Sequence, residues 1–549
     1  MRGWVKWLMA LLLAGAAGCR PGKEPSPDSG TARAEPTPVI RWRFNGVQSP
    51  QGDTVRQAWV LLSEHPEASR LRTQTREKLT TAPFRAWPAR AATATNDFAG
   101  AFHEMLRDLA AGESLFEATG DSNRFTELVL AVRLAPDRAE FWRSNLLMAF
   151  SAWSGQRPVA SATTPDWQLP LTDPGGRVRW VRAGAWTLLG WAAETPARLE
   201  QLRARLTRGE SLAGPDTNAW LEVFADLSRL PAGLRARWWR AVEGWLPDAE
   251  IAPERLPTVR LALLPRGQLM RLEGELTWSQ RLAVRLEPWQ IPSDLICDPI
   301  IGFTAARGIE GLMQKWFAAL GLPAEAAPNQ LLVWTGGAFP VQVLAAAPTP
   351  DAEKVLQSAA AVLPARFNAS LSAADAGALE LLTNAANEVA LRWTDIPPFI
   401  TPFLTVSTGS NQTHLVAGLY PNWAVPGASS PTALFGHLTR ATNLMFYDWE
   451  FTGPRAYSWR ASVNVIRNVL RKPRLDAATA AVAFLNSLTN HPGNTVTELR
   501  VADSNRLTLV RESPFVFTGA ELVWLAHWLE SPEFPFRLRF AEAQPEPAP

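Results

Sequence analysis

Apolar and polar residues alternate along many short segments of this chain. From Arg271 to Trp278 the even-numbered positions are mostly apolar and the odd-numbered positions are polar. Successive side chains of a strand point to opposite faces of its sheet, so this pattern is typical of a strand with one covered face. Other segments, such as Ile309 to Leu320 and Ala520 to Glu530, place apolar residues three or four positions apart, which predicts amphipathic helices. We therefore expect an α+β fold with mainly antiparallel sheets and helices on one face of each.

The predicted elements occur twice in the same order, in a first unit from residue 39 to 290 and a second from 291 to 536. Each unit opens with a short apolar strand that ends at a phenylalanine, Phe44 or Phe303. Each later turns at Pro-Asp, Pro136-Asp137 or Pro350-Asp351, directly into a helix that the aspartate can cap. The sequence thus predicts two tandem units that are copies of one duplicated unit.

Two further markers agree with a duplication. An apolar strand opens at Asn218 in the first unit and at Asn443 in the second, and each unit closes with a hairpin around a polar turn. The phenylalanines are 259 residues apart but the Pro-Asp turns only 214, which predicts an insertion in the first unit, the helices between Thr54 and Ala111. The alternative is that an undivided α+β chain contains strands and helices in this order without any duplication.

The first nineteen residues have the layout of an export signal. Two positive charges, Arg2 and Lys6, precede a short apolar run from Leu8 to Ala17, and the run ends in Ala16-Ala17-Gly18-Cys19. A permanent membrane helix needs about 20 apolar residues, so this run is typical of a removable signal peptide. The last four residues resemble the lipobox of bacterial lipoproteins. The resemblance implies that a diacylglycerol is attached to Cys19 and that signal peptidase II removes residues 1–18. An ordinary secretory signal is the alternative.

The segment from Arg20 to Pro38 is rich in Pro, Gly, Ser, Glu and Thr, which predicts a flexible tether over residues 19–38. We also expect a disordered tail at 537–549. Together these features predict a protein of the cell envelope that is held by lipid to a membrane. In a Gram-negative host this would be the outer membrane, with the protein facing the periplasm.

Composition narrows the class of partner. The 549 residues include 54 basic and 52 acidic side chains, and without Arg2 and Lys6 the two counts are equal. A balanced chain has no field that attracts phosphates, so nucleic acid is not an expected partner. Besides Cys19 the chain has one cysteine, Cys297, which we expect to be a small buried hydrophobic residue. The 25 tryptophans are spread evenly and are expected to fill the core.

Catalytic and cofactor motifs are largely missing. The sequence contains no Gly-x-Ser-x-Gly, Walker or Cys-x-x-Cys pattern, and His103-Glu104-Met105-Leu106-Arg107 has arginine where a zinc protease needs its second histidine. We therefore expect neither a metal nor a cofactor. The weak catalytic candidates are Asp448 and Glu450, which a strand would place on one face about 7 Å apart, near Trp449 and Trp459. The simpler interpretation is that aromatic neighbours bury the other face and that both carboxylates stay in solvent.

Three functions fit these observations. The leading one is a non-catalytic envelope lipoprotein that binds another envelope protein or a ligand. The alternatives are a hydrolase of glycan or cell wall, which would use Asp448 and Glu450, and a carrier of an apolar ligand, which would need an enclosed apolar cavity.

Overall fold

The computed structural model describes most of the chain beyond the tether. The described residues are 38–46, 66–86, 95–160, 166–171, 176–210, 218–232, 234, 256–337, 341–373, 376–383, 389–396, 400–409, 412–420, 429–469, 478–489 and 493–535. Cys19, most of the predicted tether, the predicted tail and the first predicted helix of the insertion lie outside these ranges.

Twenty strands of the described residues form one continuous sheet in which every pairing is antiparallel. The first ten are β1 (Ile40–Phe44), β2 (Ser114–Gly120), β3 (Phe125–Arg133), β4 (Val159–Ala160), β5 (Trp167–Pro170), β6 (Arg177–Ala183), β7 (Trp186–Ala192), β8 (Leu221–Asp226), β9 (Thr258–Arg266) and β10 (Leu269–Thr277). The other ten are β11 (Ile300–Arg307), β12 (Gln330–Gly336), β13 (Val343–Pro348), β14 (Ala378–Thr383), β15 (Val389–Thr394), β16 (Phe403–Thr408), β17 (Thr413–Gly418), β18 (Leu444–Phe451), β19 (Asn494–Asp503) and β20 (Arg506–Ser513).

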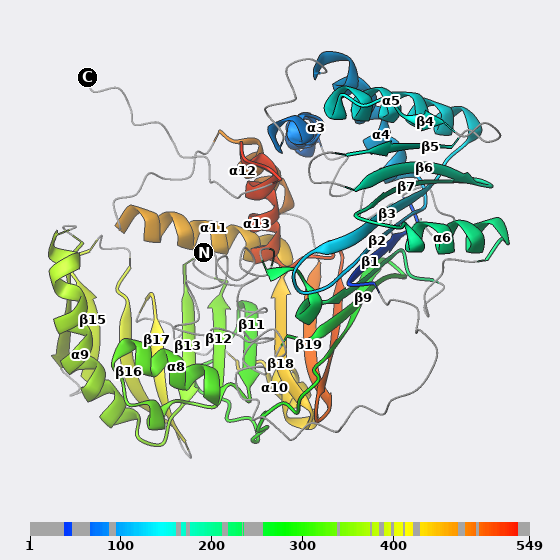
Figure 1. Ribbon diagram of the computed structural model, residues 1–549. Helices are drawn as coiled ribbons and strands as arrows, with labels where there is room; N and C mark the ends of the chain where they lie inside the picture. The colour runs from blue at the N-terminus through cyan, green and yellow to red at the C-terminus, as the bar shows by residue number, and fades with distance from the viewer. Residues whose placement is uncertain are drawn as a thin grey trace, which may run out of the picture.

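The middle of the sheet is the β10–β20 pair, whose register runs from Met270 opposite Ser513 to Thr277 opposite Arg506. Outward from β10 the order is β9, β8, β1, β2, β3, β7, β6, β5, β4. Outward from β20 it is β19, β18, β11, β12, β13, β17, β16, β15, β14. The two halves therefore have the same strand order: β9 corresponds to β19, β8 to β18, β1 to β11, and so on to β4 and β14 at the two outer edges. Figure 1 shows how strongly the sheet twists between the two halves.

The helices occupy the connections between strands. In the first half these are α3 (Pro66–Ala86) and α4 (Thr95–Ala111) before β2, α5 (Pro136–Ser154) after β3 and α6 (Ala197–Thr207) after β7. In the second half they are α8 (Glu310–Leu320), α9 (Ala352–Ala373), α10 (Thr432–Arg440), α11 (Thr452–Val469), α12 (Ala480–Leu488) and α13 (Gly519–Glu530). None of the described helices is both long and apolar enough to cross a bilayer.

The helices cover parts of both faces of the sheet. In the first half, α5 packs in a core with Trp180, whereas α6 packs in a core with Val181, the next residue of β6. In the second half, α10 packs in the core of Tyr447 and α8 in the core of Phe446. Neighbouring residues of a strand point to opposite faces, so the prediction of helices on one face only is wrong.

The two halves also meet through their helices. Ala68 and Leu71 of α3, which belongs to the first half, pack with Phe484 of α12 and Val523 of α13. The helices predicted as an insertion therefore contact the second half, and Figure 1 shows α3 beside α12.

Local pattern identified some elements and missed others, long as well as short. The hairpin of β9 and β10, the strand β18 and the hairpin of β19 and β20 lie where the sequence predicts them. The strand β11 also forms, but it continues to Arg307 and does not end at Phe303 as predicted. The short strands β4, β5 and β14 and the helices α11 and α12 were not predicted. At the start of α5, Pro136 is the first helical residue and Asp137 makes no side-chain cap bond, so its predicted capping role is wrong.

Candidate functional site

Asp448 and Glu450 are buried, contrary to the prediction that they face solvent. They lie on β18 and their exposed fractions are 4% and 3%. The alternation itself is correct, because Tyr447 points to the opposite face, where it packs beneath α10. The expectation failed because a second set of helices covers the carboxylate face, with α11 and the start of α13 above it.

Each carboxylate accepts one hydrogen bond from a different part of the fold. Thr304 of β11 donates its hydroxyl to Asp448 Oδ1 at 2.6 Å. The backbone N–H of Gly519, the first residue of α13, donates to Glu450 Oε1 at 2.6 Å. Backbone N–H groups in the first turn of a helix have no helical partner, so an acceptor oxygen is favourable there. Glu450 therefore joins α13 to the sheet.

Arg455 of α11 is the cation closest to this pair. It is buried, its Nε lies 4.0 Å from Glu450 Oε2, and its Nη1 donates to the hydroxyl of Thr335. Its guanidinium carbon also lies 4.6 Å from the centre of the Trp459 ring. Gly302 of β11 makes room for this side chain, since a Cβ there would lie 2.9 Å from Arg455 Nε.

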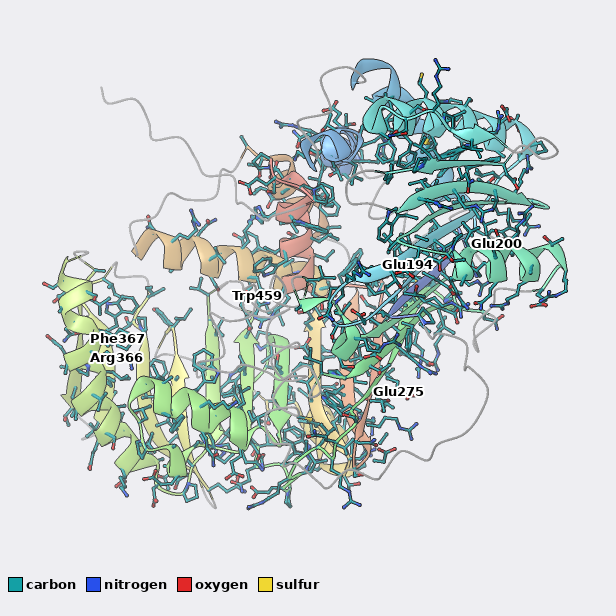
Figure 2. The ribbon with its side chains drawn as sticks, in the orientation of Figure 1. Glu194, Glu200, Glu275, Arg366, Phe367 and Trp459 are labelled. Atoms are coloured by element: carbon teal, nitrogen blue, oxygen red, sulfur yellow. The ribbon has the colours of Figure 1, made fainter. Side chains whose placement is uncertain are left out.

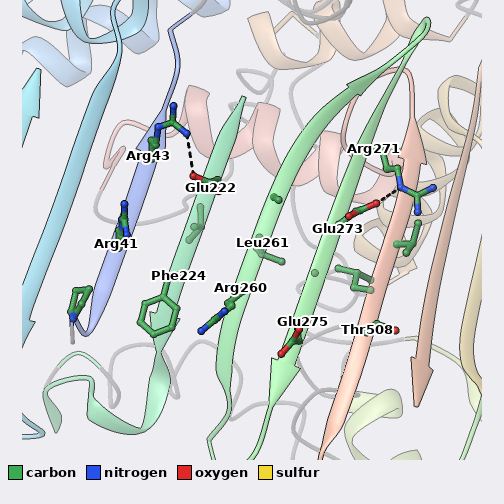
Figure 3. Close-up of a pocket in the computed structure, with 16 residues that line it drawn as sticks. Arg41, Arg43, Glu222, Phe224, Arg260, Leu261, Arg271, Glu273, Glu275 and Thr508 are labelled. Carbon is green, nitrogen blue, oxygen red and sulfur yellow. Dashed lines mark hydrogen bonds and ion pairs between the residues drawn. The ribbon is translucent and has the colours of Figure 1, made fainter. Parts of the chain in front are cut away.

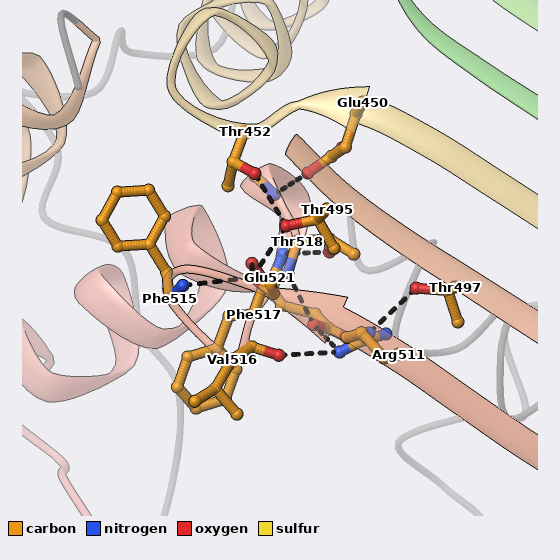
Figure 4. Close-up of polar contacts among 12 residues, drawn as sticks. Glu450, Thr452, Thr495, Thr497, Arg511, Phe515, Val516, Phe517, Thr518 and Glu521 are labelled. Atoms are coloured by element: carbon orange, nitrogen blue, oxygen red, sulfur yellow. Dashed lines mark hydrogen bonds and ion pairs between the residues drawn. The ribbon is translucent and has the colours of Figure 1, made fainter. Parts of the chain in front are cut away.

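A second ion pair completes this buried polar layer, which we define as the polar side chains between the sheet and helices α11 and α13 (Figure 4). Arg511 of β20 binds both carboxylate oxygens of Glu521, at 2.6 and 3.0 Å, and Thr497 at 2.9 Å. Thr518 and Glu521 form a reciprocal capping box at the start of α13. Hydroxyls continue the layer, with Thr495 bonded to Thr452 at 2.7 Å and to Ser513 at 2.8 Å.

Burial dominates the electrostatics of the layer. Loss of solvent raises the pKa of Asp448 to about 6, against the hydrogen bond from Thr304. It raises the pKa of Glu450 to about 8, with a further contribution from the charge of Asp448. At neutral pH Glu450 is then mostly protonated. The guanidinium groups of Arg455 and Arg511 act in the opposite direction and lower the pKa of Asp448.

This geometry favours a structural role for both carboxylates. Trp449 packs with the core beneath α10 and Trp459 stacks with Arg455 on the other face, so the two tryptophans form no common sugar platform. Each carboxylate already accepts a hydrogen bond from another element, and neither lines the groove described next. A substrate would have to displace α11 or α13 to reach them.

An open groove crosses the middle of the sheet on the face that carries α6 and α10 (Figure 3). We call it the central trough. Its volume is about 640 Å³ and its floor is formed by strands β1, β8, β9, β10 and β20. The charged and aromatic side chains that line it are Arg41, Arg43, Glu222, Phe224, Arg260, Arg271, Glu273 and Glu275.

Most charges of the central trough have a partner. Arg43 lies 3.4 Å from Glu222, Arg271 lies 2.6 Å from Glu273, and both pairs are drawn in Figure 3. Arg260 differs, because it forms no ion pair with any described residue and its guanidinium carbon lies 5.7 Å from the centre of the Phe224 ring. The trough thus presents an available cation beside a half-buried aromatic ring.

A buried ion-pair network supports the β1 side of the trough. Arg41 lies 3.5 Å from Glu117, and Glu117 also accepts hydrogen bonds from Arg198 of α6, at 2.5 and 3.0 Å. Glu127 accepts from the backbone N–H groups of Arg198 and Leu199, which fixes the start of α6. Burial raises the pKa of Glu127. These contacts hold α6 in place along the trough.

The remaining candidates from the sequence do not form a site. Within the described ranges, no group of His, Cys, Asp and Glu side chains could hold a metal ion. Arg107, in the segment that resembles a zinc motif, binds Glu104 at 3.1 Å. Cys297 is only half-buried, so the prediction of a buried residue there is wrong. Among the described tryptophans only Trp42 and Trp528 are more than a third exposed, in agreement with a role in the core.

Comparison with protein-family models, with curated proteins and with solved structures gives no match for this chain.

Proposed function

We propose that this protein is an envelope lipoprotein that lipid on Cys19 anchors to a membrane, and that its sheet binds another envelope protein without catalysing a reaction. Lipid attachment is supported by the order of charged start, short apolar run and Ala16-Ala17-Gly18-Cys19. Binding is supported by the central trough, an open surface built from strands of both halves.

The anchor has a direct chemical test. The mature chain is expected to begin at Cys19 and to carry a diacylglycerol, and Cys19→Ser is expected to leave the chain without lipid and to release it from the membrane fraction after any alternative cleavage. Mass spectrometry of the N-terminal peptide and fractionation of the envelope measure both effects. A Cys297→Ser variant is the matched control and should stay in the membrane. An N-terminus at another residue, or an unmodified Cys19, would contradict the proposal.

The chemistry of the trough specifies the kind of partner. Arg260 offers a cation and Phe224 an adjacent ring face, so the surface suits a protein segment with a carboxylate beside an apolar side chain. Arg43 is already paired with Glu222, and Arg271 with Glu273, so these charges are less available to a partner than that of Arg260.

Charge reversal tests this surface. Arg260→Glu is expected to weaken binding of the partner at least tenfold, because a repulsive carboxylate replaces the available cation. The full chain, purified from envelope in detergent with its co-purifying protein, would be compared with the variant by quantitative pull-down and then by titration with that protein. Arg107→Glu, on the exposed surface of α4, is the matched control and should bind normally. Equal binding by Arg260→Glu would exclude the trough as the interface.

We further infer that the two halves of the chain are copies of one unit. The identical strand order outward from β10 and β20 supports this inference. So do the equivalent places of the two Pro-Asp turns, before α5 and α9, and of Asn218 and Asn443, before β8 and β18. Among the described residues, α3 and α4 lie between β1 and β2, whereas one α-helix, α8, lies between β11 and β12, which fits the predicted insertion.

The alternative functions have less support. A glycan hydrolase would use Asp448 and Glu450, which are buried beneath two helices. A carrier would enclose its ligand in an apolar cavity, whereas the central trough is open and its floor carries seven charged side chains.

A further inference from the structure

The outer edge of the second half is formed by β14, whose only strand neighbour among the described residues is β15. This strand exposes apolar side chains on both faces, Leu381 at 48% and Leu382 at 37%. Phe367 of α9 and Val389 of β15 are exposed nearby, and Figure 2 shows Phe367 at this end of the molecule. At the opposite end of the sheet the outermost strand, β4, is only two residues long. An exposed apolar edge of six residues is a site where another strand can pair.

Near the start of β14, the outward backbone groups already have hydrogen-bond partners. The side chain of Asn368 accepts from the N–H of Leu379 at 2.8 Å and donates to its carbonyl at 3.1 Å, so these groups point away from β15. Trp393, which lies opposite Leu379, correspondingly donates its N–H to Pro402 on the far side. Since these directions alternate along a strand, the N–H and C=O groups of Leu381 and Thr383 also point outward. No described residue bonds to them.

We propose that β14 pairs antiparallel with β14 of a second copy of this chain, about a two-fold axis centred on Leu382. In this register Leu381 lies opposite Thr383 of the second copy, so the four outward groups of each strand bond to the four of the other. Leu382 lies opposite its own counterpart, and the two apolar side chains cover each other. Because the pairing is two-fold symmetric, it stops at two copies, and the exposed edge of each copy is covered by the other.

Two neighbouring registers of the same pair are excluded by residues of β14 itself. An axis centred on Leu381 would place Thr383 opposite Leu379, whose outward groups Asn368 already occupies. An axis centred on Glu380 would place two carboxylates directly opposite each other. The register centred on Leu382 pairs all four outward groups of Leu381 and Thr383 with the same groups of the second copy, which is the reason for choosing a second copy.

Cysteine trapping tests the register in the full-length protein in detergent, with Cys297→Ser as background. Leu382→Cys is expected to form an intermolecular disulfide on mild oxidation, because its counterpart lies directly opposite. Glu380→Cys, on the same face, is the matched control. Its counterpart would be offset by four residues, about 13 Å along the strand, which is too far for a disulfide. Equal trapping of both variants, or of neither, would overturn the register.

The oligomeric state tests the pairing itself. Sedimentation equilibrium is expected to give twice the chain mass for the wild type and the single mass for Leu381→Pro. Proline at this position removes only an outward N–H, and circular dichroism should show an unchanged fold. A monomeric wild type, a dimer that persists in Leu381→Pro, or a different protein bound at β14 in place of a second copy would each overturn the proposal.

Discussion

Replacement of Arg455 by methionine is expected to destabilise the second half of the protein by about 3–5 kcal/mol, the usual cost of removing one partner from a buried ion pair. Methionine fills much of the space of the arginine stem but removes the cation that lowers the pKa of Asp448 most. It also removes the hydrogen bond to Thr335 and the contact with Trp459. Urea denaturation followed by tryptophan fluorescence measures the loss, and hydrogen exchange should localise it to α11 and α13.

Two further variants separate charge from packing at this position. Adding Asp448→Asn to Arg455→Met should recover part of the lost stability, because it removes the carboxylate that the first change left unpaired. Arg107→Met, which removes an exposed arginine, is the control and should change stability by no more than about 0.5 kcal/mol. A loss below about 1 kcal/mol for Arg455→Met would show that the buried charge is not balanced by this side chain.

The sequence predicted the strand that carries these carboxylates but not their surroundings. Alternation along β18 correctly separated Tyr447 from Asp448, because it depends only on the geometry of one strand. It could not indicate which face is exposed, since that depends on α11 and α13, which approach from elsewhere in the chain. Thr518 and Glu521 have the spacing of a capping box, and they were the local signal that a polar helix start lies in this region.

The central trough was not predicted for a related reason. Arg41, Phe224, Arg260 and Glu275 belong to four strands and lie 183, 36 and 15 residues apart in sequence, and cross-strand register brings them into one row. Each residue alone reads as an ordinary polar or aromatic position of a half-exposed strand. The duplication could be detected in the sequence because each unit repeats the whole order of elements. The trough could not, because it combines strands of both halves and leaves no local pattern in the sequence.

The stability of the protein is expected to fall as pH rises from 6.5 to 8.5, and Glu450 is the group responsible. Its pKa is about 8 in the folded chain, above the ordinary value of 4.5, so the folded state keeps a proton that the unfolded state has released. The stabilisation from this proton is fully present below pH 4.5 and is lost as pH rises through 8. Of the other strongly shifted groups, Asp448 at about 6 and His527 at about 4 have largely finished titrating below this range, and Tyr447 at about 12 titrates above it.

Glu450→Gln should remove this pH dependence. Glutamine keeps an acceptor for the N–H of Gly519 and needs no proton. One proton changes stability by about 1.4 kcal/mol per pH unit, so the wild type should lose on the order of 2 kcal/mol between pH 6.5 and 8 while the variant stays level. Asp448→Asn, measured alongside by urea denaturation, should move the fall to lower pH, because the charge of Asp448 contributes to the raised pKa of Glu450. A wild type whose stability is constant or rises over this range would contradict a raised pKa for Glu450. A Glu450→Gln variant with the same slope as the wild type would assign the proton to another group.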